Sequence, residues 1–95
     1  MGLFGGPSKK VLDNITTGIA AKIMEEYTVN RFQNNAFYYE VFEAVAQTAE
    51  ELKLGFIAKA KYLATIRAKL ITFGMPETDA DYVQGLIQIE MRSQL

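Results

Sequence analysis

Apolar residues recur at steps of three and four along the first part of the chain, so that they share one helical face at about 100° per residue. Proline suits a first helical turn and serine caps one, and Pro7 and Ser8 stand directly before this pattern. We therefore predict a first helix from residue 9 to about Tyr27 or Asn30. Its buried stripe consists of Leu12, Ile15, Ile19, Ile23 and Tyr27.

A second apolar stripe follows the polar, asparagine-rich residues 29–37, where Asn34 or Asn35 can cap the next helix. The pattern predicts an amphipathic helix from Ala36 to about Leu54. Its polar side carries Glu40, Glu43, Gln47, Glu50 and Glu51, and its apolar side carries Tyr38, Val41, Phe42, Val45, Ala49 and Leu52.

A third helix is predicted from Phe56 to Phe73, because Gly74 suits a left-handed cap and Pro76 cannot continue a helix. Gly55 either separates the second and third helices or lies inside one long helix, since an isolated glycine costs only about 1 kcal/mol relative to alanine. We favour the break.

A fourth helix is predicted from about Ala80 to Arg92, with Thr78 or Asp79 as its cap. Acidic residues in its first turn face the positive end of the helix dipole. Gly18 and Gly85 lie inside predicted helices, where we expect them to allow close packing.

These patterns predict an all-α fold, a small bundle of about four helices. Fusion of the second and third helices into a long hairpin arm is the alternative. Ninety-five residues suffice for one domain. We expect a single helical domain at residues 9–95 and a flexible N-terminal tail at residues 1–8.

The composition excludes several kinds of binding and catalytic site, because the chain contains neither cysteine nor histidine. Disulfides, the commonest zinc ligands and imidazole-dependent nucleophiles are therefore excluded. The glutamates of the second helix are expected to form a solvated face rather than a metal site. We predict no enzyme activity, no cofactor and no metal. The absence of cysteine, of a long apolar run and of a secretory signal pattern favours a cytoplasmic location.

The predicted third helix is basic, with Lys59, Lys61, Arg67 and Lys69 and no acidic residue, although the net charge of the chain is −1. The lysines fall at scattered angles around the helix, whereas binding to phosphates needs one stripe. We therefore expect these cations to meet acidic neighbouring helices, and we do not expect nucleic-acid binding.

Arg67 differs from the lysines because it projects from the middle of the expected apolar face of this helix. A buried guanidinium without a partner costs several kcal/mol. Arg67 must therefore pair with a carboxylate, bond backbone carbonyls, extend its head group to the edge of the core, or meet a ligand or partner. We expect either an ion pair with an acid of another helix or a bidentate anchor for an anion of a partner or ligand. The expected apolar face consists of Phe56, Ala60, Leu63, Ala64, Leu70 and Ile71.

Tyr62, Ile66 and Phe73 lie about 100° away from the main apolar stripe of the third helix, and Tyr39 lies on the glutamate side of the second. A second apolar face indicates either that the third helix is central in the bundle or that one of its faces meets another chain. We predict a non-catalytic helical protein–protein interaction module, an adaptor, regulator or assembly component that self-associates and has an unidentified protein partner. The expected contact surface consists of Tyr39, Tyr62, Ile66, Arg67 and Phe73.

The alternative function is that of a peripheral membrane or lipid-binding protein. It would use the N-terminal tail, with Leu3 and Phe4 near Lys9 and Lys10, together with the basic helix 56–73. Two apolar residues and two lysines bind membranes weakly by themselves. A third hypothesis is a small apolar ligand held inside the bundle.

Overall fold

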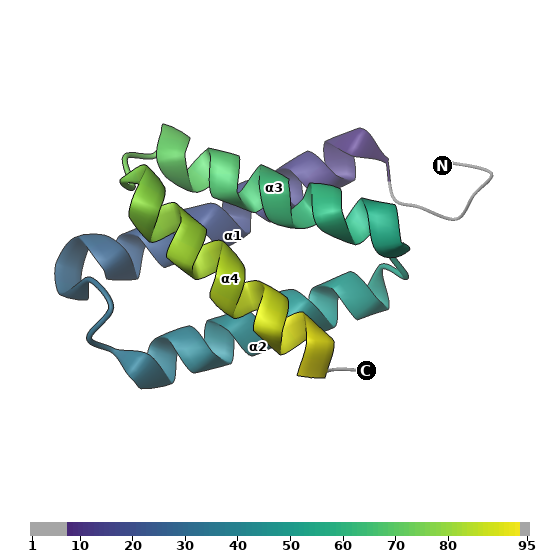
Figure 1. Ribbon diagram of the computed structural model, residues 1–95. Coiled ribbons are helices and arrows are strands. Elements are labelled where there is room, and N and C mark those ends of the chain that lie inside the picture. Colours follow the sequence, from purple (N-terminus) through teal and green to yellow (C-terminus); the bar gives the residue numbers. More distant parts are fainter. Residues whose placement is uncertain (1–7, 94–95) are drawn as a thin grey trace.

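The computed structural model describes residues 8–93, and these residues form four helices (Figure 1). No strand occurs between residues 8 and 93, so the predicted all-α fold is confirmed. Most of the expected N-terminal tail, residues 1–7, lies outside the described residues. The helices are α1 (Lys9–Asn30), α2 (Asn35–Glu51), α3 (Phe56–Thr72) and α4 (Glu77–Ser93).

The first two helices begin at side chains that the sequence identified as caps. The hydroxyl oxygen of Ser8 accepts a hydrogen bond from the amide of Val11 at 3.2 Å. The side-chain oxygen of Asn34 accepts one from the amide of Phe37, also at 3.2 Å. Each bond satisfies an amide that has no partner within the helix. The predicted starts of α1 and α2 are confirmed to within one residue.

The alternative of a fused arm is wrong, because α2 ends at Glu51 and α3 begins at Phe56. The break lies at Lys53, which has a φ of 56°. The amide of Lys53 bonds the carbonyl of Glu50, and the amide of Leu54 bonds the carbonyl of Ala49, at 3.0 and 3.2 Å. This pair of bonds is a Schellman motif built on a lysine. Gly55 is in extended conformation just before α3, so the predicted break is confirmed with a different residue as its cause.

The turn after α3 repeats the same motif on a glycine, Gly74, which has a φ of 112°. The amides of Gly74 and Met75 bond carbonyls of the last turn of α3 at 3.0 and 2.9 Å. The predicted start of α4 at Ala80 is wrong, since the amide of Ala80 already bonds the carbonyl of Pro76 and the helix begins at Glu77. Proline holds the helical φ at the entrance, so neither Thr78 nor Asp79 is needed as the cap.

The helices pack mainly as α1 with α3, α3 with α4 and α2 with α4, whereas α1 and α2 touch much less. Figure 1 shows α1 and α2 diverging from the turn that joins them, with α4 crossing in front of both. α3 therefore lies between α1 and α4. Among residues 8–93, no helix is both long enough and apolar enough to cross a membrane.

The turn between α1 and α2 is held by aromatic packing. The ring of Phe32 lies 5.3 Å from Tyr27 of α1, 5.5 Å from Tyr38 of α2 and 5.1 Å from Tyr82 of α4. The hydroxyl of Tyr27 donates to Asp79, and that of Tyr38 donates to the carbonyl of Arg31. Edge-on and tilted pairs at these distances are favourable beyond their buried area.

The core is formed by one side of each helix. In α2 it includes all the residues predicted there except Leu52, which is partly buried. In α1 the stripe is centred on Ala20, Ile23 and Tyr27, with Thr16 buried beside it. The hydroxyl of Thr16 donates to the carbonyl of Leu12 at 2.8 Å, so this buried polar group is satisfied.

The two helical glycines do not serve packing within the chain, so the prediction made for them is wrong. A Cβ placed on Gly18 of α1 or on Gly85 of α4 would meet no atom within 4 Å. Both positions therefore face open space in the folded chain.

Candidate functional site: the groove between α3 and α4

The structure does not bring the five predicted contact residues together on one surface. Tyr39 and Phe73 are exposed, on α2 and at the end of α3, and Arg67 is half-buried. Tyr62 and Ile66 are each only 1% exposed and belong to the core. Neither of these two side chains can touch a partner while the helices pack as they do.

Tyr62 and Ile66 are buried because α3 is the central helix and contacts α1 on one side and α4 on the other. The hydroxyl of Tyr62 donates to the carbonyl of Val45 in α2 at 2.9 Å. Burial raises the pKa of this hydroxyl above its usual value, because the phenolate would lose its hydration. Of the two alternatives left open for α3, a central position is therefore the one that the structure shows.

Arg67 has two carboxylate partners on α4. Its Nε lies 2.5 Å from Asp81 Oδ1, and its Nη2 lies 3.0 Å from Glu77 Oε2. The hydrogen bonds to Asp81 and then to Glu77 raise the pKa of the guanidinium. The expectation of an ion pair with an acid of another helix is thus confirmed, and Arg67 is bound within the chain.

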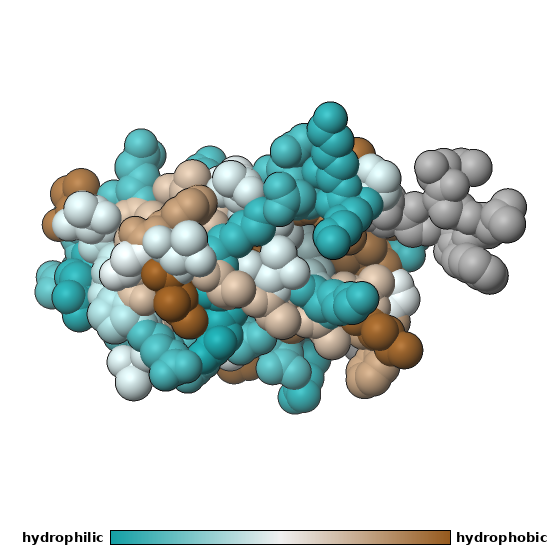
Figure 2. Space-filling model, turned by 90° about the horizontal axis from the view of Figure 1, so that it is seen from above, coloured by the Kyte–Doolittle hydropathy of each residue, from teal (hydrophilic) through white to brown (hydrophobic). Residues whose placement is uncertain are grey.

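The other cations of α3 are also placed at seams between helices. Lys59 Nζ lies 2.6 Å from Glu50 of α2, and Lys69 Nζ lies 2.6 Å from Asp13 of α1. Figure 2, which looks down on α3, shows hydrophilic side chains spread among small apolar patches. The predicted pairing of the basic helix with acidic neighbours is confirmed for these two lysines.

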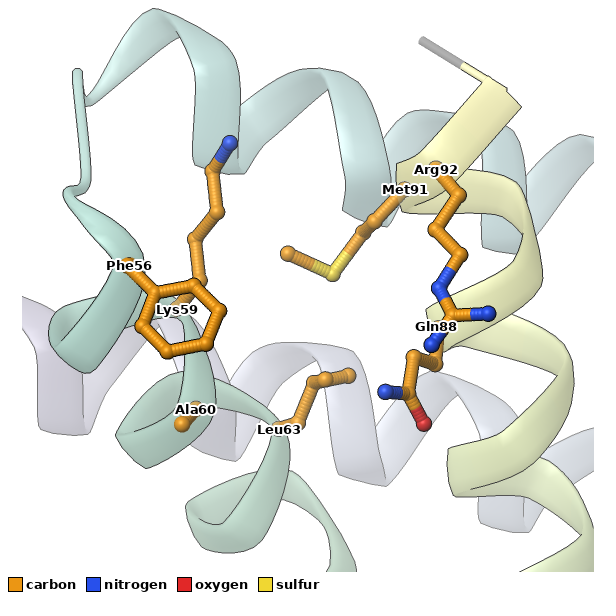
Figure 3. Close-up of a pocket in the computed structure, with 7 residues that line it drawn as sticks. All are labelled: Phe56, Lys59, Ala60, Leu63, Gln88, Met91 and Arg92. Carbon is orange, nitrogen blue, oxygen red and sulfur yellow. The ribbon is translucent and has the colours of Figure 1, made fainter. Parts of the chain in front are cut away.

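A groove of about 470 Å³ opens between the first half of α3 and the last turns of α4 (Figure 3). The two helices are joined by the short turn at residues 73–76 and diverge from it, so their far ends leave this space. We call it the α3–α4 groove. Its walls include Phe56, Lys59 and Leu63 from α3, and Gln88, Met91 and Arg92 from α4.

The groove has an apolar floor and a charged rim. Leu63 and Met91 are buried beneath it, and Figure 3 shows the thioether of Met91 turned into the space. Lys59 at the rim is neutralised by Glu50, whereas Arg92 forms no ion pair with another residue of the range 8–93. The rim therefore carries one uncompensated positive charge.

Phe56 stands at the mouth of the groove and is 90% exposed, although the sequence placed it on a buried face. Ile57 beside it is 75% exposed. α3 packs against α4 through its later turns, so its first turn has no partner there. One signal was present in the sequence: two consecutive large apolar residues are 100° apart on a helix and cannot share one narrow face.

The walls of the α3–α4 groove carry apolar side chains, two cations and one side-chain amide. Within residues 8–93, no three acidic, histidine or cysteine side chains lie close enough together to hold a metal ion. The glutamates of the solvated face of α2 are exposed, as predicted. What the groove offers is apolar surface next to a cation.

Comparisons with protein families, curated proteins and solved structures found no match to this chain.

Proposed function

We propose that the protein is a non-catalytic interaction module that binds an amphipathic helical segment of another protein in the α3–α4 groove, and that it also self-associates. The observation that carries this proposal is Phe56, a phenylalanine almost completely exposed beside a preformed apolar groove. Aromatic side chains dominate the binding energy of protein interfaces. An exposed aromatic side chain next to a concave apolar surface is therefore available as an anchor for a binding partner.

The shape and charge of the groove indicate the chemistry of the partner. Two helices form its walls, and a third helix fits such a space by presenting apolar side chains at three- and four-residue steps. Met91 on the floor can adapt to different side chains because its thioether chain is flexible. Arg92 favours an acidic residue beside the apolar stripe of the partner.

Affinity capture from extracts of the source cell tests this proposal. The unmodified protein is compared with Phe56→Ala and with Phe73→Ala, a matched change of an exposed phenylalanine at the other end of α3. A partner that binds in the groove is retained by the unmodified protein and by Phe73→Ala. Its affinity for Phe56→Ala should fall at least about tenfold, the usual effect of losing an anchor.

The outcome that contradicts the groove assignment is a partner captured equally by all three proteins. Loss of binding with Phe73→Ala alone would instead place the contact at the end of α3, where Phe73, an exposed residue of the set predicted from the sequence, lies. Phe56 is almost fully exposed, so its truncation leaves the core intact and the comparison is not confused by unfolding.

A peripheral membrane function is a second proposal, supported by a different feature of the same region. Phe56 and Ile57 protrude together at the start of α3, with the exposed Lys53 before them and the exposed Lys61 after them. Apolar side chains that enter the headgroup region beside lysines are typical of membrane-surface proteins. The tail residues Leu3 and Phe4 of this hypothesis lie outside the described residues.

Flotation with vesicles that contain phosphatidylserine separates the two proposals. A membrane-binding protein floats at low salt and sinks as salt screens the lysines, and its Ile57→Ser variant floats less. A protein that remains at the bottom of the gradient at low salt does not use these residues for membranes. Ile57 does not line the groove, so the same variant should leave capture of a protein partner unchanged.

A further inference from the structure

The side of α4 that faces away from the core is apolar near its middle. Ile89 is 63% exposed, and Tyr82, one edge of which contacts Phe32, is still 54% exposed. They are seven residues apart and therefore lie on one helical face, with Gly85 between them. Figure 1 shows α4 in front of α1 and α2, with no other helix covering this side. We call Tyr82, Gly85, Ile89 and Arg92 the outer face of α4.

Gly85 lowers the stability of α4, and no contact within the folded chain requires a glycine at this position. Glycine inside a helix is less stable than alanine by about 1 kcal/mol. A Cβ at this position would meet no atom within 4 Å, so no packing inside the chain requires glycine. A missing side chain in the middle of an apolar helical face allows another backbone to approach closely, as in helix pairs that cross at a glycine.

The charges along this face are opposite at its two ends. Near its start, Glu77 and Asp81 share one guanidinium, that of Arg67, so one negative charge is left over. Near its end, Arg92 forms no ion pair with any other residue that the structure describes. Arg92 is eleven residues after Asp81, which is close to three full helical turns, so both lie on the same flank.

We infer that two copies of the chain associate through the outer faces of their α4 helices, in antiparallel orientation about a twofold axis. Ile87 is midway between Gly85 and Ile89 and also midway between Tyr82 and Arg92. A twofold axis at its level therefore places Ile89 of each copy over Gly85 of the other. It also places each Arg92 beside Tyr82 of the other copy. The surplus carboxylate of the other copy's Glu77 and Asp81 lies there too, at the start of its α4. The face is complementary to itself, which a twofold interface requires.

The dimer is expected to be weak. A helix of 17 residues is about 25 Å long, and one pair of such helices buries less than the roughly 800 Å² per partner of a standard interface. We therefore expect a dissociation constant in the high micromolar range. This inference rests on the self-association proposed above, and the outer face shares Arg92 with the groove.

The test is sedimentation equilibrium between about 10 µM and about 1 mM, the range in which such a dimer forms. Three proteins are compared: the unmodified chain, Gly85→Gln and the matched control Gly18→Gln on α1. Both positions are open, so each variant folds at least as well as the unmodified chain. The average mass should rise toward twice the monomer mass for the unmodified chain and for Gly18→Gln, whereas Gly85→Gln should remain at the monomer mass throughout.

The possible failures are distinguishable. If the unmodified chain remains monomeric at about 1 mM, the proposed self-association is wrong and this inference falls with it, while partner binding in the groove is unaffected. If the unmodified chain and Gly85→Gln dimerise equally, self-association stands and the outer face of α4 is not the interface. Gly85 does not line the groove, so Gly85→Gln should retain any protein partner bound there.

Discussion

Tyr62 provides the sharpest test of the helix arrangement, because sequence and structure assign it different roles. The structure buries its ring between helices and joins its hydroxyl to the carbonyl of Val45 at 2.9 Å. This bond links α3 to α2, two helices that otherwise touch little. We expect Tyr62→Phe to lower the free energy of unfolding by about 1 kcal/mol and Tyr62→Ala to lower it by about 3 to 5 kcal/mol.

The two magnitudes have separate physical causes. Tyr62→Phe removes one neutral hydrogen bond, and the carbonyl of Val45 retains its bond to the amide four residues later in α2. Tyr62→Ala removes the ring and leaves a cavity in the core. A chain of 95 residues has about 5 to 14 kcal/mol of total stability, so the alanine variant loses a large part of it.

Urea unfolding followed by circular dichroism measures both changes, with Tyr82→Phe as the control. Tyr82 is half exposed, and its hydroxyl has no hydrogen bond with the residues that the structure describes, so the control should cost less than about 0.5 kcal/mol. A loss below about 1 kcal/mol for Tyr62→Ala would refute the buried position, since no cavity term could then be present. It would return Tyr62 to the surface predicted from the sequence.

Three further changes test individual parts of the fold. Burial, followed by the charge of Glu26, raises the pKa of the Tyr38 hydroxyl from 10.0 to about 12. Folding therefore favours the neutral hydroxyl, and its contribution to the free energy of unfolding should be complete below pH 10 and be lost as the pH rises to about 12. Urea unfolding at a series of pH values measures this loss. Lys53→Gly should raise the midpoint of thermal unfolding by several degrees, because it removes about 1 kcal/mol of left-handed strain; a decrease would contradict the Schellman geometry. Asn34→Ala should lower the free energy of unfolding by about 1 kcal/mol, whereas a neutral result in the same assay would mean that the cap does not hold the start of α2.

The helices could be predicted from the sequence because their signals are local. Ser8, Asn34 and Gly74 act on amides and carbonyls within four residues of themselves, and such contacts exist whatever the tertiary fold. Lys53 was not recognised as a cap because lysine has no preference for positive φ, and the tertiary fold must hold it there. The start of α4 was placed too late because Pro76 was interpreted only as the end of the preceding helix.

The site could not be predicted because it depends on the angle between two helices. Phe56 and Leu70 satisfy the same helical period, yet Leu70 is buried and Phe56 is exposed. The difference lies in the divergence of α3 and α4 from their shared turn, and no local pattern encodes that divergence. Tyr62 and Ile66 were assigned to a contact surface for a related reason: a second apolar face on a helix indicates either a second packing partner within the chain or another chain, and only the arrangement of the helices distinguishes the two.

The pairing of the helices also determines how the chain can fold. α3 and α4 are the only sequence neighbours among the described helices that pack extensively, so their hairpin closes a short loop at low entropic cost. α1 must find α3, and α2 must find α4, each across an intervening helix. We therefore expect α3 and α4 to be structured in the folding transition state, with high φ-values at Leu70 and Val83 and low ones at Ile23. The two helices that come first in the sequence, α1 and α2, are therefore expected to pack last during folding.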